Sequence, residues 1–360
     1  MMKTTIILFV LFFSSIKTTA QVDFELNHYL SGKKITSICS DSKYLWVATD
    51  GNGIYRYSYS TKNWKNYSTK KKNISLDFFF SIAANKRYVW AGSTDGLFIF
   101  DKRRRRWTKR KFGKGGQLSN WIRSLAYDKY SKVLWIGRFK YLTKFDLRRR
   151  RFKDYDLTVG NIEKTNTIKT ILVDGDSLAW FGTEAGLHKY NKHKNLDDKS
   201  AFTFYNNSRN YFGDEGDVVS VSTLISEQNN IWIGLDEFIT KSNPTYNLGG
   251  FYRFDRQNKW TRFGKREGLP GEGIFCAAIT GNYIWVSTYQ FDINKKEVNG
   301  TGVALINRLN GDVKPLLDNR IPNNIYTMYF DGTYLWLGGK NGIIQIDFQS
   351  NFKPPFDSDR

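Results

Sequence analysis

A short motif centred on tryptophan recurs seven times along this chain of 360 residues. In each copy an aromatic or aliphatic residue precedes the tryptophan, and a small residue follows it two positions later. Successive copies are separated by 44 to 53 residues, so seven of the 11 tryptophans stand in one register. These are Trp46, Trp90, Trp135, Trp180, Trp232, Trp285 and Trp336. A repeat of this length indicates a fold built from similar units.

The surroundings of the motif predict four short strands per unit. A stretch such as ITSICSD (35–41) precedes the motif, and a turn with Gly or Asn follows it, as in TDGNG (49–53). Two further strands follow, such as GIYRYS (53–58) and WKNYS (64–68). Gly and Asn tolerate the positive φ of tight hairpin turns. Four strands per unit of about 45 residues predict an all-β fold, a seven-bladed β-propeller with four-stranded antiparallel blades.

The two ends of the chain predict how the ring closes. The last unit supplies three strands, and the following NFKPPFD contains two prolines, which cannot donate ladder hydrogen bonds. Residues 22–30 resemble the outer strands of other units. We therefore expect this N-terminal strand to complete the last blade and close the ring. The predicted organisation is a signal peptide at 1–20, the propeller at 21–350 and a C-terminal tail at 351–360.

The first twenty residues have the features of a secretory signal peptide. Lys3 is followed by an apolar run at 6–13, and Thr18, Thr19 and Ala20 suit cleavage before Gln21. The alternative, an uncleaved anchor, needs about 20 apolar residues. We therefore expect a periplasmic or secreted protein, which has no access to nucleic acid despite a net charge of +21. The two cysteines, Cys39 and Cys276, are expected to be buried thiols rather than a disulfide.

The first unit, LWVATDGNGIYRYS, resembles the two-component regulator propeller repeats. Its Thr49, Asp50, Gly51, Gly53, Arg56 and Tyr57 match the form L-W-I-G-T-x-x-G-G-L-x-R-Y-D. GLPGEGI (268–274) and LSNWI (118–122) are similar to the family's links between blades. The resemblance implies a periplasmic sensor propeller of the kind that responds to glycans in hybrid histidine kinases. Since the sequence contains no kinase, membrane span or immunoglobulin-like domain, we expect it to act with a separate membrane sensor kinase.

Three long segments are predicted to lie on one sector of one face, at 205–219, 235–250 and 288–302. Long loops on a rigid scaffold commonly carry binding sites. Aromatic faces and carboxylates together suit a saccharide or another small ligand. The candidate ligand-binding residues are Tyr211, Phe212, Asp236, Glu237, Phe238, Tyr246, Tyr289, Phe291 and Asp292. The alternative is that these aromatics only pack the loops against the scaffold.

No metal or cofactor is expected, and neither is catalysis. Asp214, Glu215 and Asp217 are a chemically suitable but unspecific calcium cluster. His28, His188 and His193 are predicted to be surface residues, because no nucleophile or zinc spacing accompanies them. Two other functions remain open: a lyase of the streptogramin-lyase type, whose propellers have similar strand motifs, and a scaffold that binds other envelope proteins.

Two arginine tetrads form the most basic part of the sequence. The last arginine of each tetrad stands sixteen residues after the motif tryptophan of its unit, so both occupy the same predicted turn, between the third and fourth strands, in consecutive blades. The residues are Arg103, Arg104, Arg105, Arg106, Arg148, Arg149, Arg150 and Arg151. Guanidinium groups bind phosphates and carboxylates in bidentate fashion, so this patch suits an anionic envelope surface such as lipopolysaccharide, phospholipid headgroups or an anionic polysaccharide. The alternative is a solvated basic rim.

Overall fold

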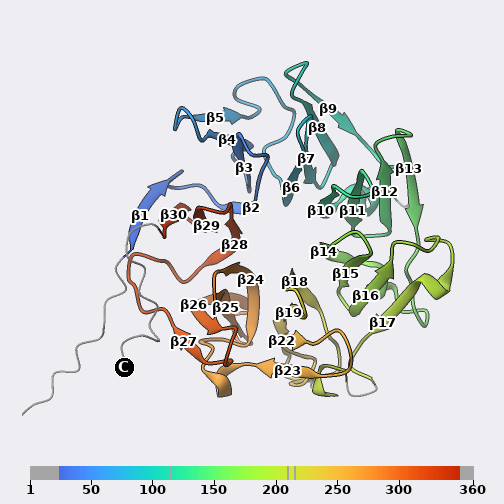
Figure 1. Ribbon diagram of the computed structural model, residues 1–360, viewed down its shortest axis with the longest axis vertical. Coiled ribbons are helices and arrows are strands. Elements are labelled where there is room, and N and C mark those ends of the chain that lie inside the picture. Colours follow the sequence, from blue (N-terminus) through green and yellow to red (C-terminus); the bar gives the residue numbers. More distant parts are fainter. Residues whose placement is uncertain (1–23, 114–115, 209–210, 215, 349–360) are drawn as a thin grey trace, which may run out of the picture.

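The computed structural model describes residues 24–113, 116–208, 211–214 and 216–348. Within these ranges seven four-stranded antiparallel sheets stand in a ring, and in each sheet the strand that precedes the tryptophan motif lies nearest the centre (Figure 1). The predicted seven-bladed β-propeller is therefore confirmed. The predicted signal peptide and C-terminal tail lie outside the described residues.

The first four blades follow the chain in order. Blade 1 has β2 (Ile35–Ser40), β3 (Tyr44–Thr49), β4 (Ile54–Ser58) and β5 (Trp64–Tyr67). Blade 2 has β6 (Ser81–Ala84), β7 (Tyr88–Ser93), β8 (Gly96–Asp101) and β9 (Arg106–Arg110). Blade 3 has β10 (Ile122–Asp128), β11 (Val133–Arg138), β12 (Leu142–Asp146) and β13 (Arg151–Tyr155). Blade 4 has β14 (Ile168–Asp174), β15 (Leu178–Thr183), β16 (Gly186–Asn191) and β17 (Phe202–Tyr205).

The remaining blades contain the insertions and the ring closure. Blade 5 has β18 (Val221–Ser226), β19 (Ile231–Leu235), β22 (Phe251–Phe254) and β23 (Trp260–Phe263), with an added hairpin of β20 (Glu237–Phe238) and β21 (Asn247–Leu248). Blade 6 has β24 (Gly273–Thr280), β25 (Tyr283–Asp292), β26 (Glu297–Asn307) and β27 (Val313–Pro315). Blade 7 has β28 (Ile325–Phe330), β29 (Tyr334–Gly339), β30 (Gly342–Asp347) and the N-terminal β1 (Glu25–Tyr29).

The N-terminal strand closes the ring as predicted. β1 pairs antiparallel with β30, from Glu25 opposite Asp347 to Tyr29 opposite Ile343. The ring of Tyr29 lies 6.1 Å from that of Trp336 in blade 7 and 5.7 Å from that of Trp64 in blade 1. The first strand of the fold therefore joins the last blade to the first.

The seven motif tryptophans are almost completely buried between blades. A small residue two positions after each leaves room for the next sheet. A Cβ on Gly137 would stand 2.7 Å from the Ile168 side chain of blade 4, and one on Gly234 would stand 2.7 Å from Ile274 of blade 6. Contacts this short do not occur between packed atoms, so these positions require glycine.

A side chain at the turn between the first and second strands accepts the indole N–H in five blades. Nε1 of Trp46 donates to Asp41 at 2.7 Å, and that of Trp336 donates to Asp331 at 2.7 Å. The same bond joins Trp180 to Asp174, Trp232 to Glu227 and Trp285 to Thr280. Among the described residues, Nε1 of Trp90 and Trp135 has no hydrogen-bond partner.

The same turns form ion pairs between blades. A cation that follows the third strand of one blade contacts the acid of the preceding blade at four of the seven interfaces. These pairs are Lys102 with Asp41, Lys192 with Asp128, Arg256 with Asp174, and Arg308 with Glu227. We call these four contacts the inter-blade ion pairs.

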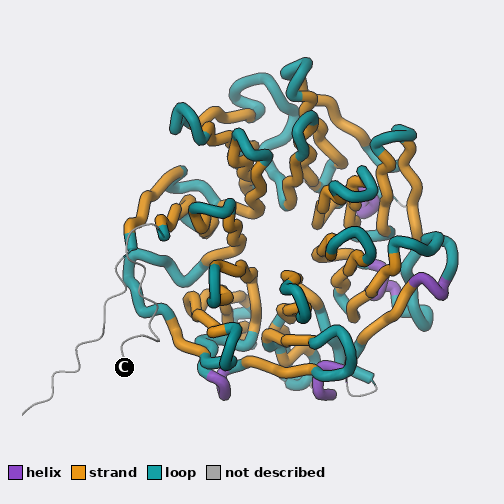
Figure 2. Tube along the Cα trace, in the orientation of Figure 1, coloured by secondary structure: helices purple, strands orange, loops and turns teal. Residues whose placement is uncertain are grey.

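Helical structure in the described residues is limited to short 3-10 turns, which lie mainly in the links between blades (Figure 2). None of the described helices is long and apolar enough to span a bilayer. The inner strands surround a central channel of about 580 Å³. Cys39 and Cys276 line this channel as free thiols; Cys276 is buried, as predicted, whereas Cys39 is only half-buried.

Candidate functional site

A cavity of about 320 Å³ opens where blades 4, 5 and 6 meet. It lies on the face that carries the turns between second and third strands, which is the face predicted from the long segments. Six predicted residues line it: Asp236, Glu237, Phe238, Tyr246, Tyr289 and Phe291. We call it the loop-face cavity.

The segment 288–302 differs from the predicted loop. It continues β25 and β26 as a paired hairpin, in register from Tyr289 opposite Gly300 to Asp292 opposite Glu297. The alternation of aromatic and polar residues in TYQFD explains the extension, because successive strand residues face opposite sides. Tyr289 and Phe291 therefore point to the same side, and both are buried, at 5% and 8% exposure.

Asp236 is the centre of a hydrogen-bonded cluster in the wall of the cavity. Its carboxylate forms an ion pair with Lys169 and accepts hydrogen bonds from Ser220 at 2.6 Å and from the Tyr289 hydroxyl at 3.2 Å. Burial alone would raise the pKa of Asp236, but the Lys169 ammonium and the hydrogen bonds outweigh it and lower that pKa. Asp236 is therefore a fixed, ionised anchor rather than a proton acceptor.

The neighbouring Glu237 has a different environment. Its Oε2 accepts the Phe291 backbone N–H at 2.7 Å, and its own N–H donates to the Tyr289 hydroxyl at 3.0 Å. Burial raises the pKa of Glu237, an effect that the Phe291 hydrogen bond only partly opposes. No described residue bonds to Oε1, so this oxygen remains available as an acceptor in the cavity.

Aromatic rings form the apolar part of the lining. Phe238 is 42% exposed, and its ring centre lies 4.8 Å from that of Phe291 and 6.2 Å from that of Tyr246. The Tyr246 hydroxyl accepts a hydrogen bond from Lys164 at 2.7 Å. An exposed ring beside hydrogen-bonding groups is the combination expected from the sequence.

Three of the predicted residues do not reach this cavity. Phe212 is completely buried, with its ring 4.5 Å from Trp260, and Tyr211 packs 5.0 Å from Tyr205. Phe212 thus fixes the link before blade 5 against the outer strand of that blade, and Tyr211 fixes it against the outer strand of blade 4, so for these two the packing alternative holds in the structure. Asp292 caps the hairpin turn by accepting the N–H groups of Asn294 and Lys295.

Blade 4 contributes residues to the cavity that were not predicted from the sequence. Lys164, Lys169 and Glu184 line the cavity opposite the predicted residues. Glu184 forms an ion pair with Arg123 of blade 3, which connects the cavity to a third interface. One sequence feature could have indicated these residues. They lie at the strand ends of blade 4 that face the same side of the ring as the long segments.

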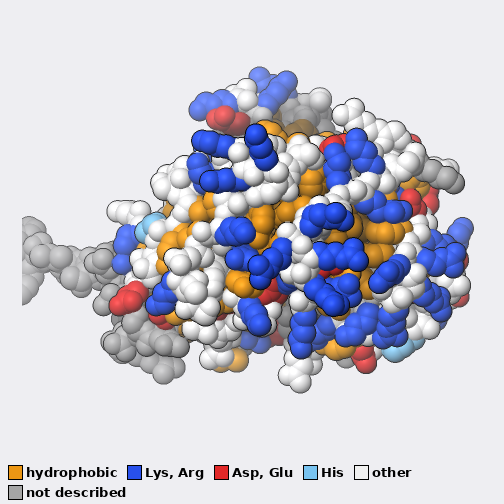
Figure 3. All heavy atoms as spheres, turned by 90° about the horizontal axis from the view of Figure 1, so that it is seen from above, with side chains coloured by type: hydrophobic (Ala, Val, Ile, Leu, Met, Phe, Trp, Pro, Cys, Tyr) orange, Lys and Arg blue, Asp and Glu red, His pale blue; other side chains and the backbone are white. Residues whose placement is uncertain are grey.

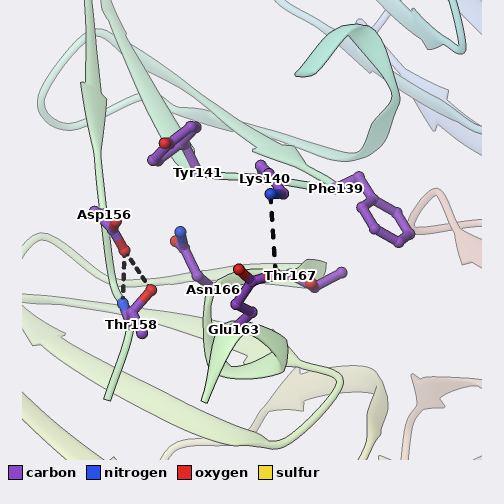
Figure 4. A pocket seen from close by; sticks show the side chains of 8 residues that line it. All are labelled: Phe139, Lys140, Tyr141, Asp156, Thr158, Glu163, Asn166 and Thr167. Carbon is purple, nitrogen blue, oxygen red and sulfur yellow. Dashed lines mark hydrogen bonds and ion pairs between the residues drawn. The ribbon is translucent and has the colours of Figure 1, made fainter. Parts of the chain in front are cut away.

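A smaller hollow of about 80 Å³ lies on the same face between blades 3 and 4. Figure 4 shows its polar lining, in which Thr158 donates to Asp156 and Lys140 faces Glu163 at 3.9 Å. Its volume accommodates little more than water, so we assign it no ligand.

Neither the calcium cluster nor the histidines form a metal site in the described residues. Asp217 bonds to Asn243 and Thr245, and Glu215 lies outside the described residues. No group of three or more His, Cys, Asp or Glu residues suited to a metal occurs in the described part of the chain.

The prediction that His188 is a surface residue is wrong. The His188 ring is 2% exposed, because Phe204 of the outer strand packs over it at 4.7 Å. Its Nε2 lies 2.9 Å from the Thr165 carbonyl oxygen, and burial lowers its pKa to about 4. His28 and His193 are exposed, as predicted.

The arginine tetrads occupy the predicted turns. Arg103–Arg105 join β8 to β9 and Arg148–Arg150 join β12 to β13, while Arg106 and Arg151 begin the outer strands. All eight are exposed. Turns between third and fourth strands lie at the opposite end of the blade from those between second and third strands. The tetrads are therefore on the other face from the loop-face cavity.

The fold is similar to two crystal structures of the extracellular domain of BT4673 from B. thetaiotaomicron, a protein described in one case as a one-component system and in the other as a hybrid two-component system. Their TM-scores are 0.64 and 0.65, each at 16% sequence identity over 91% and 90% of this chain. The chain spans 40% of the length of either structure.

A structure of YCF48 bound to a D1 peptide is also similar, with a TM-score of 0.62 and 10% identity over 90% of this chain and 96% of that one. No protein-family model matches the chain, and no curated protein matches it. At these identities the likeness establishes the fold alone. At the level of the fold it agrees with the propeller inferred from the repeats.

Proposed function

We propose that this protein is an exported, non-catalytic sensory propeller that binds a saccharide in the loop-face cavity. The observation that carries the proposal is the pairing of the exposed Phe238 ring with the available carboxylate oxygen of Glu237 in a cavity of about 320 Å³. A sugar offers C–H groups to the aromatic face and hydroxyl donors to the carboxylate. Cavities of about this size hold small ligands.

The charges of the cavity favour a neutral saccharide over a charged one. The carboxylate of Asp236 and the ammonium of Lys169 neutralise each other, and Lys164 is bound to the Tyr246 hydroxyl. Glu184 is paired with Arg123, and the remaining charges of the lining, on Lys164 and Glu237, are opposite in sign, so the cavity has no net charge to attract an ion. An uncharged ligand with hydroxyl groups is therefore the most complementary to this lining.

The similarity to extracellular domains of one- and two-component systems supports a role in signalling. We infer that the ligand-bound propeller contacts a separate membrane sensor kinase, and that the predicted leader directs the chain to the periplasm or the exterior.

The proposal is tested by thermal denaturation of residues 21–360 with a panel of neutral oligosaccharides. We expect one of them to raise the melting temperature, and Phe238→Ala to abolish the shift while leaving the unliganded melting temperature unchanged. Phe78→Ala is the matched control, because Phe78 is a 50% exposed ring between blades 1 and 2. A shift that survives Phe238→Ala, or a panel without any shift, would contradict the saccharide site.

A further inference from the structure

The interface between blades 2 and 3 departs from the repeat at both ends of the inter-blade ion pair. The turn position that holds an acid in blades 1, 3, 4 and 5 is Asn85 in blade 2. The position that holds the cation in the other pairs is Leu147 in blade 3. Leu147 is equivalent to Lys102 of blade 2, because each donates its backbone N–H to a carbonyl of the turn between the first and second strands, Lys132 and Arg87 respectively. This interface therefore has neither charge of the pair.

The loss of the acid leaves a buried donor without a partner. The side-chain oxygen of Asn85 accepts the N–H groups of Arg87 and Tyr88. In blades 1, 4, 5 and 7 a carboxylate at this position uses its second oxygen to accept the indole N–H, and an amide has no second oxygen for this bond. Nε1 of Trp90, a residue with no exposed surface, accordingly has no hydrogen-bond partner in the part of the chain that the structure describes.

The loss of both side chains also leaves space. A cavity of about 310 Å³ lies between the two blades, and Trp90, Leu147 and Phe145 are among its apolar lining. Arg87, Arg104 and Arg150 stand around it. We call it the arginine groove.

The arginines of the groove differ in their partners. Arg87 lies 3.8 Å from Asp101, whereas no described carboxylate lies within ion-pair distance of Arg104 or Arg150. The lining also contains the Asp101 carboxylate, but with Arg87, Arg104 and Arg150 around it the groove keeps an excess of positive charge. Guanidinium groups outside ion-pair distance of a carboxylate, above an apolar floor, are complementary to an anionic group attached to an apolar body.

The surroundings of the groove favour a surface of many anions over a single small acid. The other six tetrad arginines lie in the same two turns or begin the outer strands that follow them, at equivalent positions of adjacent blades. One small ligand in the groove would leave them unused. Figure 3 views the edge of the ring that stands at the top of Figure 1 and shows Lys and Arg side chains gathered over it, with apolar side chains between them. Basic clusters of this kind attract anionic bilayers, and Trp and Tyr favour the headgroup region.

We propose that the arginine groove and the tetrads bind the headgroups of anionic phospholipids and so dock this face of the propeller on a membrane surface. One lipid phosphate is held by Arg104 and Arg150 with its glycerol carbons on the apolar floor, and the other tetrad arginines contact neighbouring headgroups. The proposal is independent of the saccharide site, which lies on the opposite face.

Sedimentation of residues 21–360 with vesicles tests the proposal. We expect binding to vesicles of phosphatidylglycerol and phosphatidylcholine, none to phosphatidylcholine alone, and release as the salt concentration rises from about 0.05 M to about 0.5 M. Arg104→Ser with Arg150→Ser should lower the affinity about tenfold or more. Arg103→Ser with Arg148→Ser removes the same charge outside the groove and should lower the affinity less.

A charge-neutral variant separates the groove from general basicity. Asn85→Asp with Leu147→Arg installs the ion pair of the other interfaces, which fills the groove, and leaves the net charge unchanged. We expect this variant to fold and to lose vesicle binding by about the same factor as the Arg104 and Arg150 variant. If this variant does not fold, the comparison of the two double serine variants still shows whether vesicle binding depends on the arginine groove.

Three results would overturn the proposal. The first is full vesicle binding by the Asn85→Asp, Leu147→Arg variant, and the second is an equal loss of vesicle affinity in the two double serine variants. The third is binding of the protein to soluble glycerol phosphate or polygalacturonate without binding to vesicles. The last result would assign the groove to a free phosphate ester or an acidic polysaccharide instead of a bilayer.

Discussion

The ammonium of Lys192 in blade 4 lies 2.9 Å from Oδ2 of Asp128 in blade 3, with the two side chains 6% and 0% exposed. Asp128 also accepts a hydrogen bond from Ser131 at 2.6 Å. Although burial would raise the pKa of Asp128, the hydrogen bonds from Ser131 and Lys192 lower it. The pair thus remains ionised within the interface.

Replacing one partner of this pair should be strongly destabilising. Asp128→Asn leaves the Lys192 charge buried without a counter-charge, which costs about 3–5 kcal/mol in the free energy of unfolding. Urea denaturation measures the change. Adding Lys192→Met should recover part of the loss, and an Asp128→Asn variant with wild-type stability would contradict the role of the pair.

The close approach of blades at Gly234 makes a second prediction. Gly234→Val places its branched side chain against Ile274, where even a Cβ stands at 2.7 Å, and should lower the free energy of unfolding by about 3 kcal/mol or more. Gly113→Ala is the control, since a Cβ there meets no atom within 4 Å. Equal melting temperatures for the two variants would show that blades 5 and 6 leave room for a larger side chain at Gly234.

Removal of the closing strand is the third prediction. Deleting residues 21–30 exposes the edge of β30 and removes the Tyr29 ring from between blades 7 and 1, so we expect the melting temperature to fall by about 10 °C or more. His28→Ala, at an exposed position on the same strand, should leave it nearly unchanged. An unaltered melt after the deletion would show that ring closure does not depend on β1.

His188 predicts a specific pH dependence of stability. Its pKa is about 4 in the folded protein and near the ordinary histidine value of 6.5 in the unfolded chain. Stability from the neutral ring is therefore complete above pH 6.5 and falls as the pH drops towards 4, because only the unfolded state takes up the proton there. The loss amounts to about 3 kcal/mol.

His188→Phe provides the comparison, since it cannot titrate. The difference in unfolding free energy between wild type and variant should be constant above pH 7 and change in favour of the variant below pH 6.5. A difference that stays constant down to pH 4 would place the His188 pKa near its ordinary value.

The repeat was readable from the sequence because the motif tryptophans, such as Trp46 and Trp336, all serve the same buried position. The burial of His188 could not be predicted from the sequence. Both faces of a blade are covered by its neighbours, so the alternation of residues along a strand does not distinguish buried side chains from exposed ones. The same reason hid Arg138, whose guanidinium is fully buried and lies 2.7 Å from Asp154.

The candidate site was only partly predictable. Phe238 and Phe291 were found because they lie in segments that exceed the normal turn length. Phe212 was misplaced, since its positive φ of 56° turns the ring back into the core, a conformation that the sequence does not reveal. Lys169 was missed because its partner Asp236 is 67 residues away and meets it only across a blade interface.

The pairing of β1 with β30 also governs when the ring can form. The two strands lie at opposite ends of the propeller sequence, and Glu25 finds its partner Asp347 only after every intervening blade exists. A chain that crosses a membrane from its N-terminus would thus present β1 first and keep it without its partner until the last blade follows. During that interval both β1 and the unfinished sheets offer open edges, so assembly of this protein would call for protection that its finished ring no longer requires.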